Sequence, residues 1–124
     1  MRLTADMRDG VHNLDVEILD ANVNEALDWL SKLNGKQHTL LNLEREDGWQ
    51  VMVGGGPIHY VVTLGNGDDN LTLENPVGNQ STIVELCAGG QYGEYSETIC
   101  VGQERAVNAV SLFFQGRERE EQWG

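Results

Sequence analysis

Three histidines, two serines and one cysteine are the residues of this sequence that could form a nucleophile and its general base. They are His12, His38, His59, Ser81, Ser96 and Cys87. Such groups meet in the fold whatever their order along the chain, so a catalytic pair stays open. No nucleophile elbow or other local catalytic motif surrounds them. The pattern favours a binding protein without catalytic residues; the alternative is a small hydrolase or isomerase with a site of Asp, Glu and His.

The residues that could bind a metal show no known spacing either. The histidines match no zinc motif, and Cys87 and Cys100 form no CxxC pair. Asp68-Asp69-Asn70 offers oxygen ligands, but the alternating acidic residues and the distal glutamate of a calcium-binding loop are absent. The preceding Asn66-Gly67 is a hairpin-turn signal, so we interpret this segment as a solvated turn. We predict neither a metal nor a cofactor.

The glycine run Gly54-Gly55-Gly56-Pro57 suggests a phosphate-binding loop at first sight. Such a loop requires a Lys and a Ser or Thr after the glycines, at the start of a helix. Here a proline and the β-branched and aromatic run 58–64 follow. The glycines therefore predict a tight connection between two strands.

Carboxylates are the most abundant charged groups of the chain. Eight Lys and Arg against twenty Asp and Glu give a formal net charge of -12. This charge repels the phosphates of nucleic acid and anionic membrane surfaces, so we predict no binding to either and expect any charged partner to be basic. No signal-peptide-like or membrane-spanning apolar run is present, which favours a cytoplasmic location. We expect Cys87 and Cys100 to be free, half-buried thiols in a reducing cytosol.

The elements that position these groups follow from the hydrophobic pattern. The length of 124 residues and a hydrophobic content of 40% suit one domain, 1–124, with a single core. Residues 1–12 show no period and are interpreted as a loosely ordered arm. Alternation over 14–19 predicts a strand with an acidic polar face.

Two helices are predicted, one towards each end of the chain. Asn22 and Glu25 resemble a capping box that opens a helix over about 22–34, with Gly35 as its end. The second helix follows Gly102. Its apolar residues recur at spacings of three, four and seven, and Gly116 stops it. We expect Trp123 to return to the edge of the core and hold the charged tail in place.

Between the helices the apolar residues recur with a period of two, which is typical of strands, and three hairpins are predicted. Their strand pairs are 39–43 with 49–53, 58–64 with 71–74, and 82–88 with 95–101, the last joined by the loop 89–94. These elements predict an α+β fold: an antiparallel meander of about six short strands with the N-terminal and C-terminal helices packed on one face.

Several of these segments together resemble immunity protein family 1 of bacterial polymorphic toxin systems. They are 49–56, 60–62, 82–88, 106–117 and Trp123, and the most specific is Phe113-Phe114-Gln115-Gly116-Arg117 followed by Trp123. Where the family often has a proline after the arginine-containing stretch, this chain has Arg119-Glu120-Glu121. The resemblance implies a cytosolic protein that binds and blocks a cognate toxin domain, often a nucleic-acid deaminase.

A toxin that acts on nucleic acid has a basic cleft, which an acidic inhibitor can occupy. We therefore predict partner contacts at hairpin tips, through the carboxylates Glu46, Asp47, Asp68, Asp69, Glu94 and Glu97, with Tyr92 and Tyr95 as aromatic anchors. The free protein is expected to be a monomer or a weak dimer. A secretion chaperone or adaptor with an exposed apolar groove is a further alternative.

Overall fold

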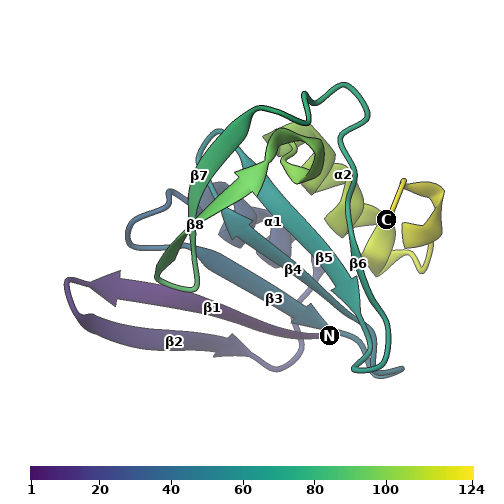
Figure 1. The fold of residues 1–124 in the computed structure, drawn as a ribbon. Coiled ribbons are helices and arrows are strands. Elements are labelled where there is room, and N and C mark those ends of the chain that lie inside the picture. The colour runs from purple at the N-terminus through teal and green to yellow at the C-terminus, as the bar shows by residue number, and fades with distance from the viewer.

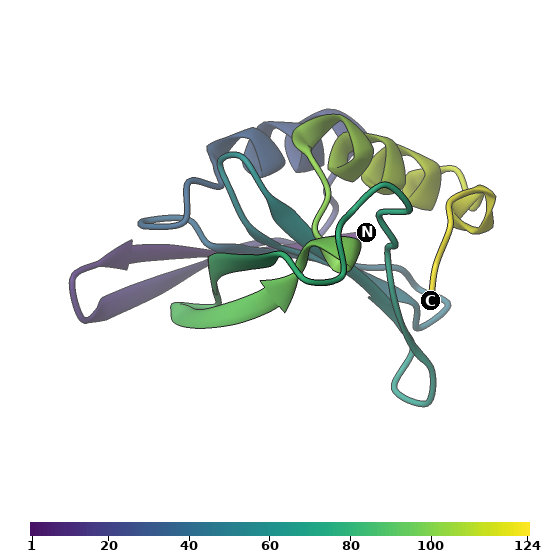
Figure 2. The ribbon, with the colours of Figure 1, turned by 45° about the horizontal axis from the view of Figure 1, so that its top comes forward.

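A six-stranded antiparallel sheet carries two helices on one of its faces (Figure 1, Figure 2). The computed structural model describes residues 1–124. The elements of this layer are β1 Arg2–Asp9, β2 His12–Ile18, α1 Val23–Lys32, β3 Leu40–Glu44, β4 Gln50–Gly55, β5 Tyr60–Gly65, β6 Asn70–Thr72 and α2 Gln103–Phe114. The strand order is β2-β1-β3-β4-β5-β6. The predicted α+β fold with a meander and two helices is confirmed.

The third predicted hairpin forms a separate two-stranded sheet, β7 Ile83–Ala88 and β8 Gln91–Ser96, and does not extend the meander. It lies on the side of the large sheet opposite the helices (Figure 2). The predicted return strand at 95–101 was wrong. Gly89 and Gly90 have φ angles of 62° and 78°, which closes the turn in two residues, so the return strand already begins at Gln91.

The N-terminal residues are ordered, contrary to the predicted loose arm. β1 lies between β2 and β3 in the sheet, and β2 begins at His12. Leu3 and Ala5 are buried in the core, while alternate residues of β1 are polar. The four charged residues of this segment interrupt its hydrophobic pattern, although the segment forms an ordinary strand with one buried face.

Helix α1 begins as the sequence predicts. Asn22 Oδ1 accepts the backbone N–H of Glu25 at 2.8 Å, and Glu25 Oε1 accepts that of Asn22 at 3.1 Å, which is a complete capping box. The helix ends at Lys32, and Leu33 follows with an extended backbone. Gly35 has a φ angle of 72°, but it lies in the following loop and does not end the helix as predicted.

Helix α2 buries the predicted apolar stripe through Ala106, Ala109, Val110 and Phe113. Gly116 adopts the left-handed region at φ 70°, and the next residue returns its N–H to Leu112 O at 2.8 Å. The helix therefore ends where the sequence predicts. Neither helix combines the length and apolar character that crossing a membrane requires.

The core lies between the helices and one face of the large sheet. Alternate residues of the paired strands enter it, as a half-buried sheet requires. The buried strand residues are Leu3, Ala5, Leu41, Leu43, Val51, Val53, Tyr60, Val62 and Leu64. The opposite face of the sheet carries polar side chains from β1, β2 and β3 and is partly covered by β7 and β8.

The C-terminal tail is held against the outer strand β6. Trp123 packs on the core, pairs with Leu73 and donates its Nε1–H to Glu118 O at 2.8 Å. Thr72 and Gly124 exchange two backbone hydrogen bonds of 2.9 Å. The predicted return of Trp123 is confirmed, and the tail covers the free edge of β6.

A largely buried ion pair connects this tail to the β3–β4 turn. Arg45 Nη1 donates to Glu118 Oε1 at 2.7 Å and to Phe113 O at 3.0 Å. The Arg45 guanidinium also lies 4.3 Å from the centroid of the Phe113 ring. Burial favours the neutral acid of Glu118, but hydrogen bonds, first of all from Arg45, outweigh it and lower its pKa below the ordinary value.

Candidate functional site

Most positive side chains of this protein are neutralised within the chain. Six of the eight Lys and Arg side chains make ion pairs, and Lys36 and Arg119 make none. Nine carboxylates are paired, including Asp20 with the N-terminal amine, which leaves eleven of the twenty unpaired. The unpaired carboxylates are Asp9, Asp15, Glu25, Glu46, Asp68, Asp69, Glu74, Glu85, Glu94, Glu97 and Glu104. The negative charge is therefore available to a partner.

The predicted contact residues fall into two groups that the structure separates. Glu46, Asp47, Asp68 and Asp69 lie in the β3–β4 and β5–β6 turns, which share one end of the sheet because Gln50 pairs with Gly65. The other group belongs to the β7–β8 hairpin or follows it, and this hairpin packs towards the opposite end. Its members are Tyr92, Glu94, Tyr95 and Glu97.

Two of the predicted carboxylates stabilise loops of their own chain. Asp47 pairs with Arg45 at 2.9 Å and accepts the N–H of Trp49 at 3.0 Å, and the hydrogen bond from Arg45 is the main cause of its lowered pKa. Glu97 Oε1 accepts the N–H of Asn79 at 2.7 Å. By contrast, Glu46, Asp68 and Asp69 are exposed and unpaired.

One face of the β7–β8 hairpin combines exposed apolar side chains with unpaired carboxylates. Ile83, Glu85, Tyr92 and Glu94 share this face because alternate residues of a strand point to the same side, and we refer to these four as the hairpin face. Tyr92 is 71% exposed and Ile83 is 56% exposed. Both glutamates are also exposed. An exposed aromatic ring beside charged groups is typical of a protein-binding surface.

Glu85 and Glu94 lie directly opposite each other across the hairpin. Two like charges in opposite positions destabilise a strand pair by about 0.2–1 kcal/mol, and neither carboxylate has a Lys or Arg partner here. A lysine at either position would stabilise the isolated hairpin. The arrangement is therefore unfavourable for folding and suitable for binding a positive group.

The sequence analysis named Tyr92 and Glu94 as contact residues and did not name Ile83 and Glu85, which the structure places on the same face. The predicted six-residue loop placed Tyr92 and Glu94 outside the strands, so their cross-strand neighbours were not recognised. The signal was present, because Gly-Gly between two alternating segments is typical of a two-residue hairpin turn.

A hollow of about 390 Å³ adjoins the hairpin face. Cys87 and Tyr92 line one side of it, Asp9 contributes from the end of β1, and Lys36 contributes from the α1–β3 loop. Arg8 also lines the hollow but is paired with Asp6, so Lys36 is the one unpaired cation in this lining. A side chain of a bound protein could enter the hollow beside the Tyr92 ring.

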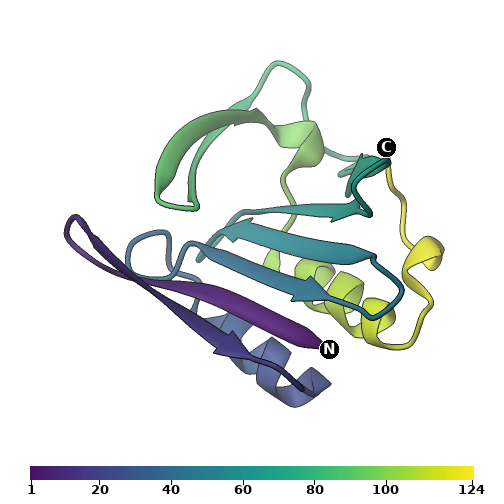
Figure 3. The same cartoon turned by 90° about the horizontal axis from the view of Figure 1, so that it is seen from below.

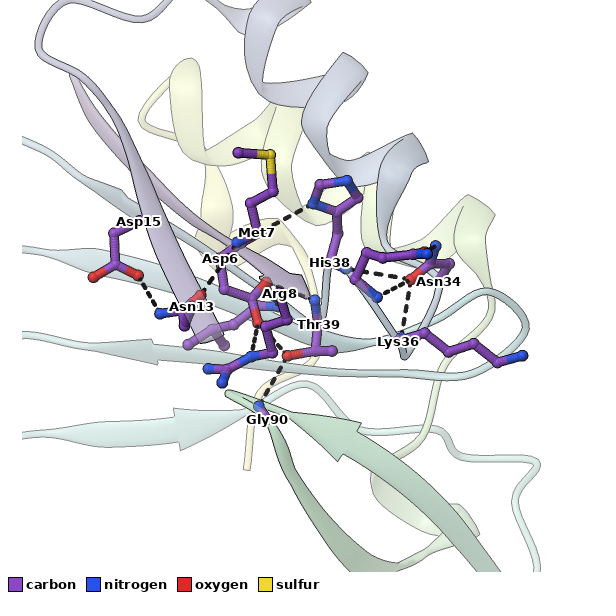
Figure 4. A network of polar contacts seen from close by, with 12 residues as sticks. Asp6, Met7, Arg8, Asn13, Asp15, Asn34, Lys36, His38, Thr39 and Gly90 are labelled. Carbon is purple, nitrogen blue, oxygen red and sulfur yellow. Dashed lines mark hydrogen bonds and ion pairs between the residues drawn. The ribbon is translucent and has the colours of Figure 1, made fainter. Parts of the chain in front are cut away.

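The turn of the β7–β8 hairpin is attached to the large sheet through a hydrogen-bond network centred on Asp6 (Figure 4). Asp6 is buried, and its Oδ1 accepts the backbone N–H groups of Thr39 at 2.6 Å and Leu40 at 3.0 Å. Its Oδ2 accepts Arg8 Nε–H at 2.7 Å and the Thr39 hydroxyl. Thr39 Oγ1 in turn accepts the N–H of Gly90 at 3.0 Å. The network holds the hairpin in one position on the sheet.

The charge on Asp6 is stabilised by this network. Burial is the largest single influence and favours the neutral acid. Together, the hydrogen bonds from Thr39, Arg8 and Leu40 outweigh the effect of burial. The pKa of Asp6 is therefore lowered from its ordinary value of 3.8. The folded state therefore favours ionised Asp6.

Apolar contacts secure the other side of the hairpin. Leu86 and Ala88 point away from the hairpin face and pack on Gly55 and Gly54 of β4. A Cβ atom added at Gly54 would lie 2.7 Å from Ala88 Cβ, which is too close for real side chains. Glycine at position 54 therefore allows β7 to approach the sheet.

Gly54→Ala is expected to lower the free energy of unfolding by about 1–3 kcal/mol, because the added methyl group displaces β7. Urea denaturation measures this change. Adding Ala88→Gly should recover part of the loss, since it removes the atom that clashes. A double variant less stable than Gly54→Ala alone would contradict this packing.

The residues that could act in catalysis are not joined to one another. No hydrogen bond links a histidine to Ser81, Ser96 or Cys87; His38 Nδ1–H donates to Asp6 O at 2.9 Å. No group of three or more His, Cys, Asp or Glu side chains is arranged to hold a metal ion.

The free state of Cys87 and Cys100 is confirmed, and both are more buried than the predicted half-buried thiols. Burial, followed by the nearby Glu97 carboxylate, raises the pKa of the Cys100 thiol.

No protein-family model matches this sequence, and no curated protein matches it either.

Proposed function

We propose that this protein is a cytoplasmic immunity protein that binds and neutralises a cognate bacterial toxin domain. The toxin acts on nucleic acid, as a deaminase or a nuclease, and presents a basic cleft. The hairpin face enters or covers this cleft, with Tyr92 as the aromatic anchor and Glu85 and Glu94 as partners of its Lys and Arg side chains. The free inhibitor is a monomer or a weak dimer without a cofactor.

The opposed, unpaired glutamates beside an exposed tyrosine carry this proposal. A like-charge pair of this kind weakens the hairpin, yet a basic partner converts both charges into favourable interactions. The net charge of -12 supports the same sign of partner. The sequence resemblance to the immunity family supports the class of partner.

The two groups of carboxylates have different roles in this account. Glu85 and Glu94 make the contacts that determine the dissociation rate, because they lie beside the apolar anchor. Asp68 and Asp69 lie at the other end of the sheet and add to the long-range field that accelerates association. Attraction of this kind weakens with added salt.

Co-expression with the toxin domain encoded in the adjacent reading frame tests the proposal. We expect the protein to restore growth of cells that express this toxin and to co-purify with it. Its binding should slow as ionic strength rises. Failure of both rescue and co-purification would refute the proposed function.

A further inference from the structure

The two edge strands of the large sheet differ in whether another segment covers them (Figure 1, Figure 3). The β6 edge is covered by the C-terminal tail through the two hydrogen bonds between Thr72 and Gly124. The other edge is β2, which pairs with β1 and has no strand beyond it. Natural sheets usually protect such an edge with a covering segment, a bulge, a proline or charged side chains, especially lysine. β2 has no covering segment, bulge, proline or lysine, and its only charged residues are Asp15 and Glu17; its pairing with β1 is continuous from Leu3↔Ile18 to Asp9↔His12.

The backbone of β2 offers free hydrogen-bonding groups to solvent. Arg8 of β1 donates its N–H to Gln37 O, on the side of β3. Alternation along β1 then directs the backbone groups of Met7 towards β2, and the pairing directs those of Asn13 and Asp15 away from β1. The same alternation applies to Glu17. No group of the chain bonds to these outward N–H and C=O groups.

The side chains of β2 divide into two faces that could recognise an added strand. Leu14, Val16 and Ile18 lie on the side of the helices, and Leu14 is 63% exposed. Asp15, which has no cationic partner, and Glu17, which is paired with Arg2 at 2.6 Å, lie on the opposite side with Asn13. An added strand would therefore meet apolar residues on one face and carboxylates on the other.

The charge of β2 disfavours a second copy of this chain as the occupant. Antiparallel pairing of two β2 strands about Asp15 would place Asp15 opposite Asp15, and like charges in opposite positions are destabilising. A strand that alternates Lys or Arg with apolar residues would instead pair favourably on both faces.

We propose that the β2 edge binds an extended segment of the partner protein as an additional antiparallel strand, in which basic and apolar residues alternate. This inference rests on the proposed function in one respect: it takes from it that the partner is positively charged. Main-chain hydrogen bonds to Asn13, Asp15 and Glu17 supply affinity, and the two faces of β2 supply specificity. The hairpin face and the β2 edge are then two separate contacts with the toxin.

Hydrogen exchange of the full chain with a seven-residue peptide of alternating lysine and valine tests this proposal without the toxin. Near saturation, exchange of the Asn13, Asp15 and Glu17 amides should slow by about tenfold, while that of the Lys36 amide should not change. A control peptide with the same residues, N-methylated on the side that faces β2, keeps the charge but cannot pair. Equal protection by both peptides, or protection that appears only in β7 and β8, would overturn the proposal.

Asp15→Pro removes one outward N–H and leaves the bonds to β1, since proline is tolerated on an edge strand when its nitrogen faces solvent. We expect the affinity for the peptide to fall at least about tenfold, with a much smaller loss in Asp15→Asn, the matched control that removes the same charge and keeps the N–H. Unchanged affinity in Asp15→Pro would contradict the β2 contact. The comparison of the two peptides decides the question even if Asp15→Pro folds poorly. Failure of both toxin rescue and co-purification, with normal pairing of the peptide, would refute the proposed function and leave the β2 contact intact.

Discussion

Glu85→Lys is expected to make the folded protein more stable and its complex with the basic toxin domain weaker. The introduced lysine lies opposite Glu94, so a repulsive pair becomes an attractive one and the free energy of unfolding rises by about 0.2–1 kcal/mol. In the complex the same lysine faces positive side chains, and we expect a loss of about 2–5 kcal/mol of binding free energy. Thermal unfolding and calorimetric titration measure the two changes.

Asp68→Lys is the matched control for this prediction. It changes the net charge by the same amount at an exposed, unpaired carboxylate in the β5–β6 turn. We expect a slower association with little change in the dissociation rate, because Asp68 acts through the long-range field. Equal losses of affinity in Asp68→Lys and Glu85→Lys would show that net charge, and not the hairpin face, determines binding.

Asp6→Ala is expected to lower the free energy of unfolding by about 3–5 kcal/mol, because it removes the buried carboxylate that accepts hydrogen bonds from Thr39, Leu40 and Arg8. The hairpin also loses part of its attachment, so toxin binding should weaken as well. Thr39→Val is a graded control: it removes only the hydroxyl that links Asp6 to Gly90 and should cost about 1 kcal/mol. Urea denaturation measures both variants, and a loss in Asp6→Ala no greater than that in Thr39→Val would contradict this role.

The pH dependence of Asp6→Asn provides a second test of the network. The pKa of Asp6 is lower in the folded chain than in the unfolded chain, so its ionisation adds stability above about pH 4 that is lost as the pH falls through the folded value. The stability of Asp6→Asn should therefore fall less steeply below about pH 4 than that of the natural protein. Asp47 and Glu118 also have lowered pKa values and keep their contributions in this variant. Identical slopes in the two proteins would contradict the stabilised charge on Asp6.

The sequence predicts those parts of the fold that depend on local signals. The capping box at Asn22, the stop at Gly116 and the turn at Asp47-Gly48 each involve residues within a few positions of one another, and all are confirmed. The predicted return of Trp123 to the core is also confirmed, because burial of a large apolar ring is favourable even when the surrounding tail is charged.

The errors of the sequence prediction concern partners that lie far apart in the chain. β1 was missed because its burial depends on β3, and its charges interrupt the apolar pattern. The position of β7 and β8 depends on Thr39 and Gly54, which no local pattern connects to Gly90 or Ala88. The hairpin face could not be assembled without that register, since Glu85 becomes significant only opposite Glu94.

Carboxyl footprinting of the complex tests the central claim most directly. A water-soluble carbodiimide modifies exposed carboxylates, and mass spectrometry compares each site in the free protein and in the protein bound to the toxin domain. We predict that Glu85 and Glu94 are modified in the free protein and protected in the complex, while Asp68 and Asp69 are modified equally in both. Protection of Asp68 and Asp69 with continued modification of Glu85 and Glu94 would contradict the proposed binding surface.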